Sequence, residues 1–278
     1  MSTGKSLRLK RLIDAHGVAL ICALDHGMTS PRFLEPLADI AQRVREAITG
    51  GANAIMISKG MLRMAGDAFA PDTAVCMMLS ASSRPQRERP DIVVIAEVEE
   101  ALRLGADAVV LYVSLEGDDE PEMLRALAKA GRECERLGMP LIAEAEFPTT
   151  YASVEGLASE YGLAYLERNV RMCGELGADL IKTNWPGSEE EFGRLVRAAN
   201  GLPVVHAGGS RISDGELLER QEAAMRAGAI GCSVGRNIFM HDDPEAITRA
   251  LAAVIRERRS AADALAELER AAPAASPA

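Results

Sequence analysis

The chain has 278 residues, a length that suits either one parallel α/β barrel of about 250 residues or two small domains. Hydrophobic residues make up 48% and charged residues 26%, which is typical of a soluble globular protein and excludes disorder as the default. The net charge of -10, without a long basic stripe, argues against nucleic acid as a partner, and the apolar run from Gly17 to Leu24 is too short to cross a bilayer. We expect a cytoplasmic protein with neither a nucleic-acid nor a membrane partner.

A repeated phrase marks the ends of helices along the chain. A Gly-Ala pair precedes an apolar run at Gly51, Gly105, Gly177 and Gly228. Glycine suits the left-handed position after a helix, and each following run has the length of a buried parallel strand. A second phrase, Gly-x-Pro before an apolar run, starts strands at Gly138 and Gly201.

Two further apolar runs bring the number of predicted strands to eight. Val18 to Leu24 is the first strand, and the third is Asp91 to Ile95, with Ala74 to Leu79 as the alternative. The polar stretch from Ser80 to Pro90 reads as a loop whose arginines could reach the site. Those arginines are Arg84, Arg87 and Arg89.

Periodic segments rich in Ala, Leu, Glu and Arg alternate with these strands and predict helices. They are Phe33 to Thr49, Ala96 to Leu104, Pro121 to Leu137, Leu163 to Leu176, Glu189 to Ala199, Gly215 to Ala227 and Pro244 to Arg258. Eight alternating units favour an α/β fold with a single (β/α)8 TIM barrel over residues 1–270 and a flexible tail over 271–278. An open doubly wound sheet is the alternative, which the absence of a GxGxxG phrase after the first strand weakens.

Scattered cysteines and histidines predict neither disulfides nor a metal site. The cysteines, which read as small buried residues in a reduced compartment, are Cys22, Cys76, Cys134, Cys173 and Cys232. The four histidines show no ligand spacing, so we expect neither a metal nor a cofactor.

The polar residues that follow the strands are the candidate site residues, because a TIM barrel carries its active site at the carboxyl ends of its strands. Lys182 directly follows the sixth strand, where burial is expected to lower its pKa and leave an amine that can attack a carbonyl. A structural lysine paired with a carboxylate is the alternative, and Lys59 holds a similar position. The other strand-end residues are Asp25, His26, Ser58, Ser114, Glu144, Glu146 and His206.

Glycines after the last two strands predict a phosphate site. Gly208, Gly209 and Gly235 can present backbone N–H groups, and Arg236 supplies a charge partner. Ser210 extends the first of these segments. The predicted partner is therefore a small phosphorylated sugar or keto compound, while His26 and His206 are either substrate contacts or barrel-rim histidines.

These phrases resemble the archaeal-type class I fructose-bisphosphate aldolase family, which includes 2-amino-3,7-dideoxy-D-threo-hept-6-ulosonate synthase and belongs with the deoxyribose-phosphate aldolase superfamily. The matching phrases begin at Ala23 (ALDHG), Ile57 (ISKG), Leu180 (LIKT), Ala207 (AGG) and Val234 (VGRNIF). The resemblance implies a metal-independent barrel that forms a Schiff base on Lys182, with Asp25 assisting proton transfer and Gly208, Gly209, Gly235 and Arg236 binding phosphate. It also implies a ring-shaped homo-oligomer.

Two departures from the family pattern concern the acid and the substrate. The family's Tyr-Pro-Arg-Gly phrase, whose tyrosine is the general acid/base, is replaced by Phe147-Pro148-Thr149-Thr150, with one residue inserted before it. The Leu-Ser-Gly-Gly phrase is replaced by Leu79 to Arg84. These changes argue against fructose 1,6-bisphosphate as the substrate. We expect Glu146 to replace the tyrosine, with Glu144 next and Tyr151 third, unless both glutamates only hold cations.

The predicted function is therefore a Schiff-base aldolase or aldolase-like synthase that acts on a ketose phosphate. A thiolase-like lyase on the same barrel is a related alternative. An isomerase or epimerase that uses Asp25 or Glu144 as a base, without a covalent intermediate, is an alternative from another class. A non-catalytic sugar-phosphate sensor is a third reading, supported by the missing tyrosine alone.

Overall fold

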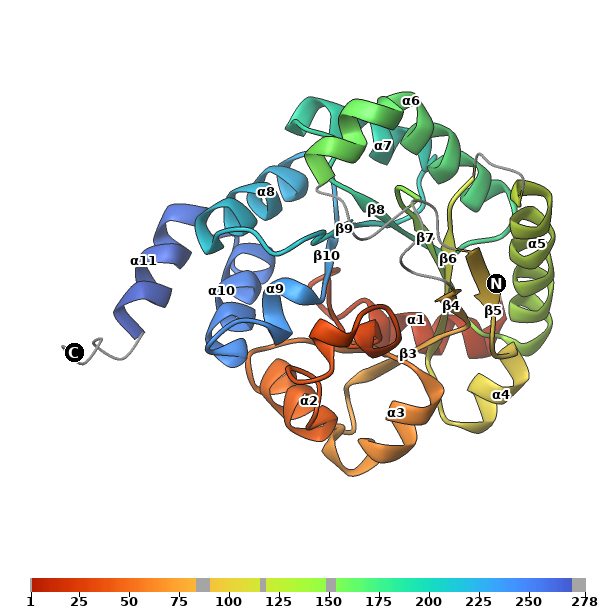
Figure 1. The fold of residues 1–278 in the computed structure, drawn as a ribbon, viewed down its shortest axis with the longest axis horizontal. Coiled ribbons are helices and arrows are strands. Elements are labelled where there is room, and N and C mark those ends of the chain that lie inside the picture. Colours follow the sequence, from red (N-terminus) through yellow and green to blue (C-terminus); the bar gives the residue numbers. More distant parts are fainter. Residues whose placement is uncertain (1, 84–90, 116–118, 149–153, 272–278) are drawn as a thin grey trace.

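Eight parallel strands close into a barrel in the computed structural model, which describes residues 2–83, 91–115, 119–148 and 154–271 (Figure 1). Around the barrel the strands follow the order β1-β10-β9-β8-β7-β6-β3-β2. The predicted fold class is therefore confirmed. The strands are β1 (Ala19–Ala23), β2 (Ala54–Ile57), β3 (Ala74–Met78), β6 (Ala108–Val113), β7 (Leu141–Ala145), β8 (Leu180–Asn184), β9 (Val204–Ala207) and β10 (Gly231–Val234).

The helices mostly surround the barrel and cover the outer faces of its strands, while the first one packs against the barrel interior at one end (Figure 1). They are α1 (Thr3–Leu12), α2 (Ile40–Thr49), α3 (Lys59–Met64), α4 (Val98–Arg103), α5 (Glu120–Leu137), α6 (Val154–Glu175), α7 (Glu189–Ala198), α8 (Asp214–Arg226), α9 (Arg236–Phe239), α10 (Pro244–Arg256) and α11 (Ala261–Ala271). Short 3-10 turns lie at His26–Met28, Pro31–Phe33 and Gly66–Ala68. Across the described ranges, no helix is long and apolar enough to span a membrane.

The Gly-Ala phrases lie where the pattern predicts. Gly51, Gly105, Gly177 and Gly228 all have a positive φ, between 81° and 106°, and each precedes a barrel strand. The predicted helix from Phe33 begins later, at Ile40, because the Asp39 carboxylate caps that helix by accepting from the Gln42 N–H at 2.8 Å. The sequence did not predict α1, α3, α9 or α11, and Ala271, the first residue of the predicted tail, ends α11. The rest of that tail, 272–278, lies outside the described residues.

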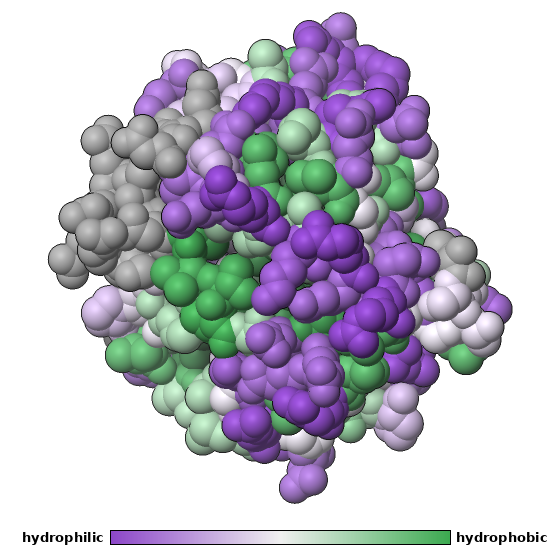
Figure 2. Space-filling view, turned by 90° about the vertical axis from the view of Figure 1, so that its right-hand side faces the viewer, coloured by the Kyte–Doolittle hydropathy of each residue, from purple (hydrophilic) through white to green (hydrophobic). Residues whose placement is uncertain are grey.

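The preferred third strand was wrong. Asp91–Val94 is β5, which pairs antiparallel with β4 (Ser80–Ser83) in a separate two-stranded sheet, while the alternative run supplies β3. A barrel strand is buried on both faces, and Ala74–Met78 nearly meets that condition, whereas β5 exposes Val93 and Val94. These valines lie on the side of the molecule that carries α4 and α5, where apolar patches interrupt a hydrophilic surface (Figure 2). The loop arginines Arg84, Arg87 and Arg89 lie outside the described residues.

Two apolar layers hold the fold together. Inward side chains such as Ile21, Met56 and Ile142 fill the barrel, and Leu12 at the end of α1 packs with them. Outward side chains of the same strands pack against the helices in a second cluster. All five cysteines are buried and free, as predicted. Polar side chains in the inward layer are therefore exceptions, and most of them lie near the carboxyl ends of the strands.

Candidate active site

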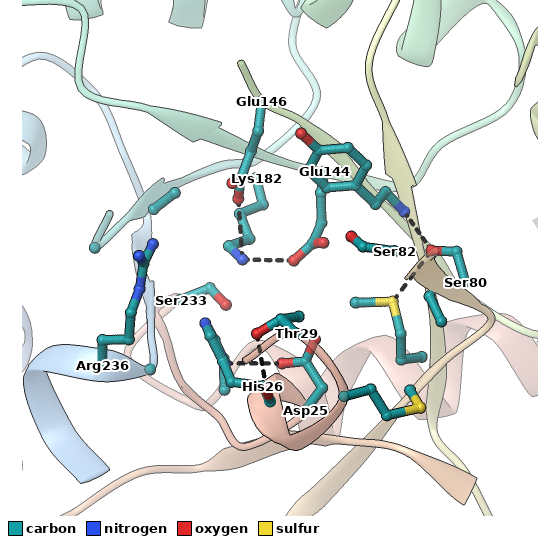
Figure 3. Close-up of a pocket in the computed structure, with 18 of the residues that line it drawn as sticks. Asp25, His26, Thr29, Ser80, Ser82, Glu144, Glu146, Lys182, Ser233 and Arg236 are labelled. Carbon is teal, nitrogen blue, oxygen red and sulfur yellow. Dashed lines mark hydrogen bonds and ion pairs between the residues drawn. The ribbon is translucent and has the colours of Figure 1, made fainter. Parts of the chain in front are cut away.

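Strand register places the central residues of the site side by side. Tyr112 of β6 aligns with Glu144 of β7, which aligns with Lys182 of β8. Because alternate residues of a strand point to the same face, these side chains point into the barrel with Glu146, two residues after Glu144. They line a cavity of about 740 Å³, counted with the space open to solvent, at the mouth of the barrel (Figure 3).

Lys182 lies between two carboxylates. Its Nζ is 2.5 Å from Glu144 Oε1 and 3.0 Å from Glu146 Oε1, and all three side chains are buried. Burial alone would lower the pKa of Lys182, but the charges of Glu144, Glu146 and Asp25 outweigh it, and the pKa is raised. The expected lowering of this pKa was therefore wrong. The alternative of a lysine paired with a carboxylate describes the contacts of the free enzyme, in which the amine is protonated.

Glu144 is the group in this cluster that titrates near neutrality. Burial raises the pKa of its carboxyl to about 7, and the charges of Glu146 and Asp25 add to that effect. The ammonium of Lys182 opposes the shift without cancelling it. A carboxyl group with this pKa exists in both protonation states at pH 7, as a general acid or base requires.

Asp25 and His26 lie at the end of β1, on the opposite side of the cavity from Glu144 (Figure 3). His26 Nδ1 is 3.5 Å from Asp25 Oδ1. The imidazole ring lies edge-on to the ring of Phe33 and is tilted against the ring of Phe239. Burial would raise the pKa of Asp25, but the charges of His26 and Lys182 lower it overall. Asp25 is therefore an ionised group facing Lys182 across the cavity.

The predicted phosphate segments lie together along one side of the cavity. Gly208, Gly209, Gly235 and Arg236 all line it, and Arg236 is 8% exposed. Asn237 joins the two segments, because its side-chain nitrogen donates to the carbonyls of Gly208 at 3.0 Å and Ser210 at 3.1 Å. A Cβ at Gly235 would lie 2.6 Å from the Ala23 carbonyl oxygen, so glycine is required there.

Several predicted residues lie away from the cavity. Lys59 begins α3, where its ammonium donates to the Ile95 carbonyl at 2.8 Å and to Glu100 at 3.1 Å, so it is not positioned as a substrate contact. His206 points outward from β9 and hydrogen-bonds Gln221 at 3.2 Å, as a structural histidine. Ser210 does not line the cavity. Tyr151 lies outside the described residues.

Five polar residues of the cavity wall were not predicted from the sequence, and one of them is Thr29, which follows the turn after β1. Tyr112 was hidden inside an apolar strand, although a phenol that points into a barrel at a strand end is a usable signal. Ser80, Ser82 and Ser233 also line the cavity, and Ser80 Oγ accepts from the Tyr112 N–H at 3.1 Å. Alternation along each strand would have identified Tyr112 and Ser233 as inward-facing.

Two synthases are similar in sequence to most of this chain. The chain is 37% identical over 254 residues to the 2-amino-3,7-dideoxy-D-threo-hept-6-ulosonate synthase of Halobacterium salinarum, covering 91% of this chain and 92% of that protein. It is 32% identical to the 2-amino-4,5-dihydroxy-6-oxo-7-(phosphonooxy)heptanoate synthase of Streptomyces griseus, covering 90% of both.

Solved structures show the same barrel. An archaeal fructose 1,6-bisphosphate aldolase superposes with a TM-score of 0.80 at 25% identity, covering 91% of this chain and 99% of that one. A Schiff-base-forming fructose-1,6-bisphosphate aldolase superposes with a TM-score of 0.77 at 26% identity, covering 90% and 99%. Residues 19–241 match the family described as DeoC/LacD family aldolase. The chain belongs to this aldolase family.

Proposed function

We propose that the chain is a class I aldolase or aldolase-like synthase in which Lys182 forms a Schiff base with the carbonyl carbon of a ketose phosphate. The observation that carries this proposal is a buried lysine held between two carboxylates, in the same cavity as Arg236 and the glycine segments. Nucleophilic lysines of this kind form an iminium that draws electrons from the bond to be broken.

The protons move between groups already in contact. Lys182 first passes a proton to Glu144, whose raised pKa suits it to accept one near neutrality. The neutral amine then attacks the carbonyl, and the resulting carbinolamine loses water as a carboxylic acid protonates its hydroxyl group. In the cleavage direction, a base takes the proton of the hydroxyl group on the departing carbon. The aldehyde leaves, and the enamine carbon is protonated or forms a bond to a second aldehyde. Water then hydrolyses the resulting iminium, which releases the product and returns the free amine of Lys182.

Glu146 is the proposed replacement for the family tyrosine. The carboxylate of Glu146 points into the barrel, 3.0 Å from Lys182 Nζ. The ring of Phe147 instead stacks on Tyr165 at 6.0 Å between centroids, behind the barrel wall. The residue inserted before the Phe-Pro pair therefore supports Glu146 as the acid, because it places a carboxylate inward and the phenyl ring outward.

The charges in the cavity support a polyhydroxy substrate with one phosphate near Arg236. Three carboxylates, Asp25, Glu144 and Glu146, lie around Lys182, and they would repel a carboxylate attached to the reacting carbonyl. The names of the two relatives in sequence, both of them synthases, support an enzyme that joins the enamine to a second aldehyde. We also propose that the enzyme is cytoplasmic and a ring-shaped homo-oligomer.

Borohydride trapping tests the covalent step. Borohydride added during turnover with a panel of ketose phosphates is expected to inactivate the enzyme and to attach substrate to the peptide that contains Lys182. Lys182→Met should abolish the adduct, while Lys59→Met, which changes a lysine outside the cavity, should keep it, and EDTA should leave activity unchanged. An adduct on Lys59, or turnover with no adduct at all, as expected of an isomerase or epimerase, would overturn the proposal.

A further inference from the structure

The backbone that leaves β7 is held by side chains from both neighbouring strands. Thr183 Oγ1 of β8 donates to the Ala145 carbonyl at 2.8 Å. Asn184 Oδ1, also from β8, accepts from the Phe147 N–H at 2.7 Å. From the other side, the Tyr112 hydroxyl of β6 donates to the Phe147 carbonyl. Both polar groups of Phe147 are thus fixed by buried side chains.

This arrangement determines where Glu146 lies. Glu146 is placed between Ala145, whose carbonyl is held, and Phe147, whose N–H and carbonyl are held. The ring of Phe147 is also fixed, because it is 1% exposed and stacks on Tyr165. A carboxylate on a backbone anchored on both sides has few positions available, and here it lies 3.0 Å from Lys182 Nζ.

We propose that Tyr112 and Asn184 are positioning residues that hold the Phe147 peptide and thereby aim the Glu146 carboxylate at the Schiff-base lysine. The inference rests on the proposed function, because it assigns the role of Glu146 to acid/base chemistry at Lys182. Tyr112 does not itself move a substrate proton in this account, since its hydroxyl donates to a backbone carbonyl. Its influence on the reaction passes through Glu146.

Tyr165 provides a matched control. It is a second buried phenol, and its ring stacks on Phe147. Its hydroxyl contacts Ser114 Oγ at 3.2 Å, a group that Tyr112 also hydrogen-bonds, whereas Tyr112 is the phenol that donates to the Phe147 carbonyl. Tyr165→Phe therefore removes one hydroxyl from the same region while leaving the described contacts of the Phe147 peptide in place. Tyr112→Phe removes the hydroxyl that holds that peptide and keeps the ring.

A double-mutant cycle separates positioning from a merely structural role. Single-turnover rates are measured for the wild type, Tyr112→Phe, Glu146→Gln and the double variant, with Tyr165→Phe alongside. Tyr112→Phe is expected to slow cleavage by about 10- to 100-fold, the range for a misplaced reacting group, and Tyr165→Phe by less than about twofold. In the Glu146→Gln background, Tyr112→Phe should add less than about twofold, because Tyr112 acts through Glu146.

Hydrogen exchange provides a readout that does not depend on activity. The Phe147 amide is expected to exchange faster in both Asn184→Ala and Tyr112→Phe than in the wild type or Tyr165→Phe. Unchanged exchange in both variants would overturn the inference, as would additive losses in the cycle or an equal loss in Tyr165→Phe. A wild type that forms no Schiff base with any ketose phosphate would refute the proposed function instead, and exchange would still test the anchoring of Phe147.

Discussion

Removing Glu144 gives the sharpest test of how the site makes a nucleophile. Glu144→Gln keeps the shape of the side chain but removes the charge 2.5 Å from Lys182 Nζ, in a pair of buried groups. A nearby opposite charge shifts a pKa by about 1–3 units, and each unit corresponds to about 1.4 kcal/mol. The Lys182 ammonium should therefore lose about 1–4 kcal/mol of stabilisation, and its pKa should fall by about 1–3 units.

The expected result has two parts, because Lys182 should lose its proton more easily while turnover should slow. The pH at which borohydride traps half of the substrate on Lys182 should fall, because the amine loses its proton more easily. The turnover number at neutral pH should nevertheless drop by about 10²-fold, because the carboxyl whose pKa is about 7 is no longer present to carry the proton.

Borohydride trapping at a series of pH values between about 6 and 10 measures how easily Lys182 loses its proton, and steady-state kinetics measure the turnover number. Glu175→Gln is the control, since it removes an exposed carboxylate that pairs with Arg171 at 2.6 Å, far from the cavity in the chain's outer helices. If trapping keeps its pH dependence in Glu144→Gln and turnover is intact, the role given to Glu144 is refuted.

Three further predictions concern the rest of the barrel. Arg236→Ala should weaken inhibition by inorganic phosphate about 10- to 100-fold, through the loss of a charge-assisted contact, whereas Arg249→Ala on the surface should not. Burial lowers the pKa of His206 to about 4, so its neutral form stabilises the fold above about pH 6.5. That contribution, about 3 kcal/mol, is lost as the pH falls from about 6.5 to 4. In urea titrations at a series of pH values, the free energy of unfolding of His206→Gln should fall less over this range than that of the wild type. Gly235→Ala should destabilise the fold by about 1–3 kcal/mol and reduce activity, because the added Cβ would clash with the Ala23 carbonyl. Gly60→Ala is the control, because a Cβ at Gly60 would have no neighbouring atom within 4 Å.

The barrel was predictable from the sequence because its repeating unit has a strong local signal. A glycine with positive φ ends a helix and an apolar run follows, and this pattern occurs at Gly51, Gly105, Gly177 and Gly228. The third strand was not predictable in the same way. Two short apolar runs compete there, and only pairing with β2 and β6, a tertiary property, selects Ala74–Met78 over Asp91–Val94.

The expectation that site residues lie at the carboxyl ends of the strands located part of the cavity. It did not consider whether each side chain points into the barrel or away from it. Lys182 and Glu144 lie near the carboxyl ends of β8 and β7 and Asp25 follows β1, and all three line the cavity together. His206 also lies at a strand end, but it occupies an outward position, so its ring lies against Gln221. Tyr112 was missed for the opposite reason, because an inward-facing phenol looks like one more apolar residue when only composition is read.

The sign of the Lys182 pKa shift could not follow from position, because burial and partners act in opposite directions. Burial lowers this pKa, and the three carboxylates around the ammonium raise it further than burial lowers it. In the proposed mechanism Glu144 takes the proton of the lysine, and the two carboxylates that stay charged, Glu146 and Asp25, favour the later iminium, which keeps a positive charge on the same nitrogen. Contacts that hold the free amine protonated therefore also stabilise the cationic intermediate, and the raised pKa of Glu144 gives the displaced proton a place to go. A site built in this way does not need a lysine with a low pKa, because it needs only a proton acceptor within hydrogen-bonding distance of the ammonium.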